Sequence, residues 1–205
     1  MERVLRRSLL VGAPLFVCAR AAPGATPLPP VPIFIRVVDD GGPVASGDFV
    51  DELVGQTSSI FAEHEIAFTE AKARATIDAK WAALETRADR DGLADLLEPG
   101  VANVFLVRSL RDVDDPKRFR MGVMWRCLKN LKKRYVIVAA SAMPTTLAHE
   151  LGHFLGLPHA YVKNNLMSYD RDEGAKVFLD KGQGETCRRT ARGLFAKKEL
   201  VAAAS

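Results

Sequence analysis

Three of the chain's four histidines lie within eleven consecutive positions, and this cluster constrains the fold most. On a helix, His149 and His153 lie one turn apart on one face, so both imidazoles can reach one Zn2+ at about 2.0–2.1 Å. Glu150 lies about 100° further round, where its carboxylate can reach a water molecule on the metal. Gly156 can end the helix in a left-handed turn. His159 would then return as the third ligand, leaving a fourth position for water.

The order of these residues is His-Glu-x-x-His-x-x-Gly-x-x-His, which resembles the motif of the metzincin zinc metalloproteases. All five defining residues are present. The alternative is an amphipathic helix with surface histidines, which leaves the near absence of histidine elsewhere unexplained. The remaining histidine, His64, has no motif partner, and we expect it to be solvated at a helix end.

A second element supports the resemblance. Residues 165–169 read Asn-Leu-Met-Ser-Tyr and resemble the Met-turn of the serralysin, astacin and pappalysin branches. The resemblance implies that Met167 lies beneath the metal. It also implies that Tyr169 contacts the metal or the reaction intermediate. A packed aromatic ring after a tight turn is the alternative for Tyr169.

The N-terminus has the pattern of a signal peptide, expected to span residues 1–21. Arg6 and Arg7 precede an apolar run of about eleven residues, which is too short to span a bilayer. The arginine pair also resembles a twin-arginine export motif. An ordinary apolar helix is the alternative. Lipidation of Cys18 is disfavoured, because Val17 is large where a small residue is expected.

Composition gives no sign of a nucleic-acid partner. Residues 1–21 carry four arginines and one glutamate, so the rest of the chain holds 25 basic and 24 acidic side chains. The basic character of the whole chain is therefore mostly that of the expected signal. Outside this segment there are two cysteines, Cys127 and Cys187. In an oxidising compartment an even count predicts one disulfide, and two separate buried thiols are the alternative.

Residue patterns predict alternating strands and helices. The expected strands cover residues 31–38, 66–69, 101–107, 121–126 and 135–140. The expected helices run from Ser46 or Asp48 to about Glu63, from Pro144-Thr145-Thr146 through the histidine motif, and over residues 185–200. Residues 71–98 are ambiguous between helical turns and loop.

The strand before the motif contains Gly122, Val123 and Met124. In metzincins the strand in this place is the antiparallel edge of the sheet, and substrate lies along it. The resemblance therefore makes these three residues candidates for substrate binding. A plain amphipathic strand with Trp125 in the core is the alternative.

The element order resembles the metzincin catalytic domain, an α+β fold with a mixed twisted sheet, over nearly the whole chain after residue 31. Residues 22–31 are expected to be a flexible lead-in or short propeptide, and 32–205 the catalytic domain. An upper subdomain (32–157) and a smaller lower one (158–205) would flank the substrate cleft.

Together these features predict an exported zinc endopeptidase, secreted or periplasmic, acting on proteins or peptides with Glu150 as general base. No nucleic-acid partner and no stable membrane insertion after signal removal are expected. One alternative is a non-catalytic binding protein on a metzincin scaffold, although the intact Glu150 argues against it. The other is a protease specialised for a single partner protein.

Overall fold

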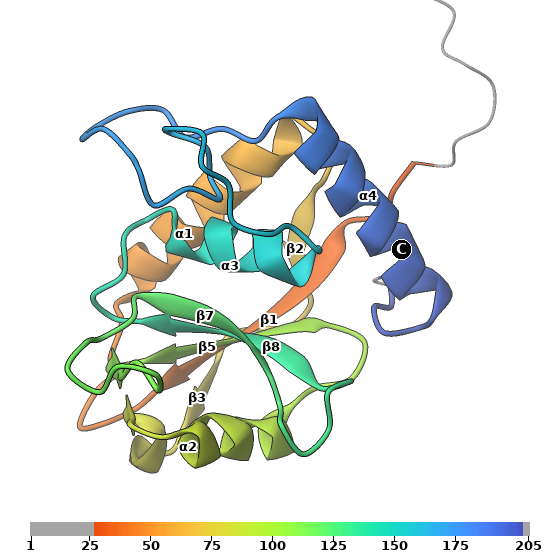
Figure 1. Cartoon of the computed structure of the whole chain (residues 1–205). Helices are drawn as coiled ribbons and strands as arrows, with labels where there is room; N and C mark the ends of the chain where they lie inside the picture. The colour runs from red at the N-terminus through yellow and green to blue at the C-terminus, as the bar shows by residue number, and fades with distance from the viewer. Residues whose placement is uncertain (1–26, 203–205) are drawn as a thin grey trace, which may run out of the picture.

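A computed structural model describes residues 27–202 (Figure 1). The expected signal peptide, Cys18 and residues 22–26 of the expected lead-in lie outside the described residues. Among residues 27–202, no helix is long and apolar enough to cross a membrane.

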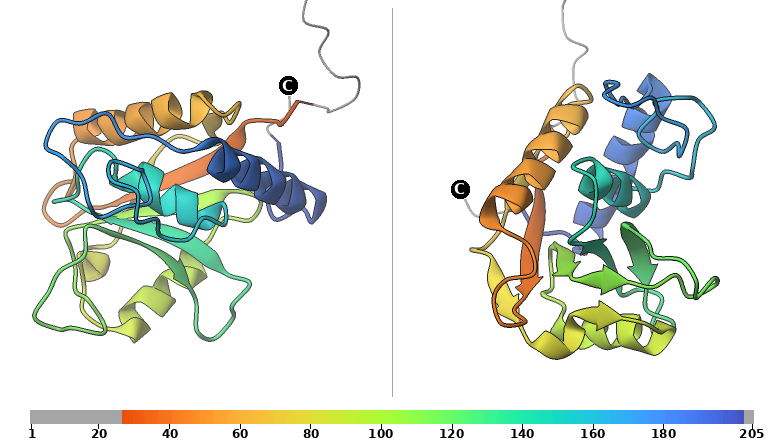
Figure 2. Two further views of the ribbon diagram at one scale, coloured as in Figure 1. Left: turned by 45° about the horizontal axis from the view of Figure 1, so that its top comes forward. Right: turned by 90° about the vertical axis from the view of Figure 1, so that its left-hand side faces the viewer.

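A six-stranded sheet forms the centre of the molecule (Figures 1 and 2). Five of its strands run parallel, and one edge strand, β7, runs antiparallel to its neighbour β8. The strand order is β2-β1-β5-β8-β7, and β3 pairs with the other end of β1. The bounds are β1 (Val31–Val38), β2 (Phe68–Glu70), β3 (Ala75–Ile77), β5 (Ala102–Val107), β7 (Gly122–Arg126) and β8 (Arg134–Ala139).

Helices cover both faces of this sheet (Figure 2). One face carries α1 (Gly47–Ala62), α3 (Thr146–Phe154) and α4 (Lys181–Ala196). The other carries the short helix α2 (Arg87–Gly92), which is followed by the 3-10 turn η2 (Leu93–Leu96). The remaining short elements are η1 (Ala79–Trp81) and the parallel pair β4 (Ala83–Leu84) and β6 (Ser109–Leu110).

Two hydrophobic cores result, because successive residues of a strand face opposite sides of a sheet. On β5, Val104 belongs to the core under α1, α3 and α4, and Phe105 belongs to the core on the α2 side. The central strands are buried on both faces, as is typical of parallel strands. The predicted α+β fold with an antiparallel edge strand is confirmed.

Most of the predicted elements are confirmed, and the deviations have local causes. The ambiguous residues 71–98 form β3, η1, β4, α2 and η2, all of six residues or fewer. The last helix begins at Lys181 rather than residue 185, because Asp180 and Gln183 form a reciprocal capping box. Two glycines in its first turn weaken the helical pattern in the sequence.

The predicted disulfide between Cys127 and Cys187 is wrong, since both are free thiols in the structure. Cys127 is buried in the core on the α2 side, and Cys187 in the core under α4. The sheet therefore separates them, and a bridge requires α-carbons within about 7 Å. Burial raises the pKa of the Cys187 thiol to about 12, which makes it a poor nucleophile.

This arrangement predicts the thiol chemistry of the folded chain. Cys127 and Cys187 should resist alkylation by iodoacetamide in native buffer and both react in denaturant without a reductant. Mass spectrometry of the labelled peptides measures this. Labelling that requires prior reduction of either residue would show that the disulfide forms after all.

Candidate metal centre

The helix α3 brings the first two histidines together. Leu147, Leu151 and Phe154 bury one side of this helix in the core, so its position against the sheet is fixed. His149 and His153 leave it one turn apart, with ring centroids 4.8 Å from each other. The predicted i, i+4 placement is therefore present.

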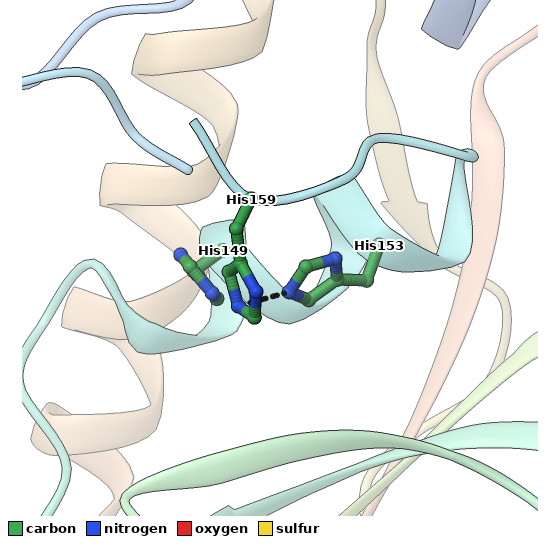
Figure 3. Close-up of side chains that lie close together, drawn as sticks. All are labelled: His149, His153 and His159. Atoms are coloured by element: carbon green, nitrogen blue, oxygen red, sulfur yellow. Dashed lines mark hydrogen bonds between the residues drawn. The ribbon is translucent and has the colours of Figure 1, made fainter. Parts of the chain in front are cut away.

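The third histidine returns because the helix ends at a left-handed glycine. Gly156 has φ +92°, and a Cβ there would lie 2.9 Å from the Thr190 hydroxyl on α4. Leu157 N–H then donates to Gly152 O, which closes the helix end. His159 follows, and its Nε2 lies 3.1 Å from His153 Nε2 (Figure 3).

Backbone carbonyls orient two of the rings. Nδ1 of His149 lies 2.7 Å from Leu166 O, and Nδ1 of His153 lies 2.8 Å from Leu157 O. A proton on each Nδ1 satisfies these contacts and leaves the Nε2 lone pairs free. One nitrogen from each of the three histidines lies within 4.8 Å of the others.

This donor set fits a zinc ion. Burial lowers the pKa of His149 to about 4, and burial also lowers the pKa of His153 and of His159. All three rings are therefore neutral near pH 7, as metal ligation requires. Two tetrahedral zinc ligands at 2.0–2.1 Å stand about 3.3 Å apart, close to the spacing of the His153 and His159 nitrogens. Three histidines with room for a fourth ligand are typical of a catalytic site.

Met167 lies against α3 at Gly152, the residue before His153. It is completely buried, and a Cβ at Gly152 would lie 2.6 Å from its sulfur. The turn is held by Asn165, whose side chain accepts the Met167 N–H and bonds to Gln183 on α4. The Met-turn is thus joined both to the motif helix and to the last helix.

Arg171 is a part of this centre that sequence reasoning did not identify. Its guanidinium donates to Ser168 O, to the Thr145 hydroxyl and to Leu166 O. Leu166 O is also the carbonyl that contacts His149, so this arginine ties the Met-turn to the start of α3. A lone arginine in a polar loop gives no signal of this role in the sequence.

Tyr169 lies beside the third histidine at the mouth of the site. Its hydroxyl lies 2.8 Å from His159 Nε2, and 72 % of the residue is exposed. It is therefore not a packed core aromatic. The exposure leaves the ring free to contact a ligand in the cleft.

Glu150 lies on the same helix but is turned towards β7. It is only 6 % exposed, and burial raises its pKa to about 7, while a hydrogen bond from Met124 N–H lowers it. A Cβ at Gly122 would lie 2.9 Å from Glu150 Cγ and 2.7 Å from Thr146 Cγ2. Glycine at this position therefore makes room for the carboxylate and for the packing of α3 on the strand.

The edge strand presents part of its backbone to the cleft. Ala139 N–H donates to Met121 O, and Cys127 N–H donates to Lys133 O, so these residues face β8. Alternation then turns the backbone groups of Gly122 and Met124 to the free edge, whereas those of Val123 pair with β8. The Val123 side chain still lines the cleft.

One cleft joins all these groups. Glu150, His153 and His159 line it together with Tyr169 and residues 122–125 of the edge strand. Its far wall carries charged side chains that sequence reasoning did not single out. They are Arg87, Arg90, Arg120, Asp112 and Asp114.

Comparison with known proteins identifies the architecture. No family model and no curated protein matches the chain. Mirolysin in complex with compound 9 superposes with a TM-score of 0.62 at 11 % identity, covering 86 % of this chain and 100 % of that one. The chain has the fold of metzincin-type metallopeptidases.

Two further solved structures agree. Metalloproteinase-II from Bacteroides fragilis gives a TM-score of 0.57 at 12 % identity, covering 82 % of this chain and 55 % of its own. Archaemetzincin from Methanopyrus kandleri gives a TM-score of 0.55 at 14 % identity, covering 80 % of this chain and 96 % of its own. At such identities the likeness establishes the fold.

The crowding around Gly122 predicts a stability effect. Gly122→Ala should lower the free energy of unfolding by about 1–3 kcal/mol, because its Cβ forces Glu150 or α3 to move. Urea denaturation measures the loss. Gly55→Ala is the matched control, since Gly55 lies on the exposed face of α1 with no heavy atom within 4 Å of a built Cβ. That variant should gain up to about 1 kcal/mol. Equal stabilities of the two variants would contradict the packing described here.

Proposed function

We propose that this chain is a zinc-dependent metalloendopeptidase. The observation that carries the proposal is the convergence of three neutral imidazoles on one point, beside a buried carboxylate and below a free strand edge. A peptide bond needs a polarised carbonyl, an activated water and a proton for the leaving nitrogen. This cleft brings together groups for each requirement.

His149, His153 and His159 would hold the metal through Nε2. When bound, Zn2+ supplies Lewis acidity, which polarises the scissile carbonyl and lowers the pKa of water at the site. Glu150 accepts the proton of the attacking water and passes it to the leaving nitrogen. Burial raises the pKa of Glu150 towards the ambient pH, which suits both halves of this transfer, because a base and an acid work best there.

The edge strand offers the means of holding an extended peptide. The backbone groups of Gly122 and the carbonyl of Met124 lie on the free edge, where a substrate strand can add to the sheet, whereas the Met124 N–H donates to Glu150. Such backbone pairing positions the scissile carbonyl without requiring particular side chains in the substrate. We further propose that Tyr169, whose hydroxyl lies beside His159, donates a hydrogen bond to the oxyanion that develops.

The buried carboxylate favours an enzyme over a binding protein that only retains the scaffold. Burial penalises the charged form of Glu150, and an apolar residue of similar size would avoid this cost. We further propose that the chain is exported, on the signal-peptide pattern of residues 1–21.

Glu150→Gln separates metal binding from chemistry. The variant should bind one zinc per chain, since the three histidines are intact, and lose about 10²–10⁴-fold in kcat/KM on denatured casein or a quenched peptide library, since the base is gone. Metal analysis by plasma mass spectrometry accompanies the rate assay. Near-normal turnover by this variant would refute the assignment of the base.

Metal removal tests the function as a whole. Treatment with 1,10-phenanthroline should abolish peptide hydrolysis, and one equivalent of Zn2+ should restore it, because the metal supplies the Lewis acidity that the proposed reaction requires. The Glu150→Gln protein treated in parallel controls for a contaminating protease. Hydrolysis that survives complete metal removal would rule out the proposed mechanism.

A further inference from the structure

The cleft wall opposite the metal centre contains an arginine held in place by a buried carboxylate. Arg120 precedes β7, and its Nε lies 2.7 Å from Asp112 Oδ2. The Asp112 side chain is 5 % exposed, and its other oxygen accepts the backbone N–H groups of Asp114 and Asp115. Asp112 is therefore fixed by the loop, and it fixes the orientation of the Arg120 guanidinium.

The rest of this guanidinium faces the cleft. Neither Nη of Arg120 has a hydrogen-bond partner among residues 27–202, and 46 % of the side chain is exposed. Its positive charge reaches the catalytic groups. Burial raises the pKa of Glu150 and lowers that of His159, and the charge of Arg120 lowers both values.

The neighbouring charges leave this wall positive. Arg87 pairs with Asp114 at 2.5 Å, and Arg120 with Asp112. Arg90 is 3 % exposed and lies with its guanidinium 4.8 Å from the Trp125 ring centroid. Within the described chain it has no carboxylate oxygen within 4.0 Å, and its Nε has no hydrogen-bond partner. Three guanidinium groups thus face two carboxylates.

We propose that Arg120 binds a carboxylate side chain of the substrate, so that this cleft prefers peptides with an aspartate or glutamate close to the scissile bond. The inference rests on the proposed function, because it names the substrate class of the same site. The free Nη pair can grip a carboxylate through two parallel hydrogen bonds. Arg90 adds long-range attraction from the buried side of the wall. The competing role for Arg120 is purely structural, as the partner of Asp112.

The test measures binding, so that it does not depend on turnover. In the zinc-loaded Glu150→Gln protein, fluorescence anisotropy would follow fluorescein-labelled decapeptides that carry Glu or Gln at each position in turn. At one or two adjacent positions, the peptide with Glu should bind about tenfold more tightly than the peptide with Gln. A further Arg120→Gln change in the protein should reduce this ratio of affinities to about twofold or less. The ratio should also fall with added salt, because the carboxylate pairs at a half-exposed site.

Two variants separate recognition from structure. Arg108→Gln is the matched control, since Arg108 is similarly exposed and pairs with Asp40 outside the cleft, and it should leave the ratio unchanged. Arg120→Lys keeps a cation beside Asp112 but loses the two parallel Nη donors, so it should give an intermediate ratio of Glu to Gln affinity. Thermal unfolding of each variant confirms that it is folded.

The outcomes distinguish the two proposals. An undiminished Glu preference in Arg120→Gln, no preference at any position, or no binding of any acidic peptide would overturn this inference. Acid-selective binding without hydrolysis by the zinc-loaded native protein would instead refute the peptidase assignment and leave the Arg120 site standing. Efficient cleavage without acid preference would refute the Arg120 site and leave the peptidase assignment standing.

Discussion

The convergence of His149, His153 and His159 depends on two close approaches of the backbone. The helix can reverse at Gly156 because glycine accepts φ +92°. The Met-turn can reach the helix because Gly152 has no Cβ to meet the Met167 sulfur. These approaches bring Leu157 O and Leu166 O to the Nδ1 atoms of the helical histidines. The same chain segments therefore position the rings and select their tautomers.

Burial of the ligands and of Glu150 sets the protonation states on which the chemistry of this site depends. Removing the imidazoles from water keeps them neutral, and removing Glu150 from water raises its pKa towards neutrality. Both shifts disfavour the charged forms of these groups. The charges of nearby arginines then also affect which forms are populated. Arg171 reinforces the Met-turn through backbone carbonyls, while Arg120 adds positive charge on the opposite wall. The apolar interior and the two guanidinium groups together determine which protonation states the cleft supports.

The sequence predicted the parts of this molecule that depend on local periodicity and on the spacing of the motif. The histidine spacing predicted a cluster that the structure contains, and the apolar, β-branched runs predicted β1, β5 and β8. Residues 71–98 escaped prediction because elements of six residues or fewer show too little periodicity. The disulfide prediction was wrong because the number of cysteines does not reveal on which side of the sheet each thiol lies. Arg120 and Arg171 escaped because their partners are set by loop geometry.

X-ray absorption at the zinc K edge of the zinc-loaded protein tests the central claim most directly. We predict three imidazole nitrogens and one oxygen at about 2.0–2.1 Å, with the imidazole scattering reduced to two rings in His159→Ala. Two or fewer imidazoles in the native protein, or a sulfur ligand at about 2.3 Å, would contradict the metal centre described here.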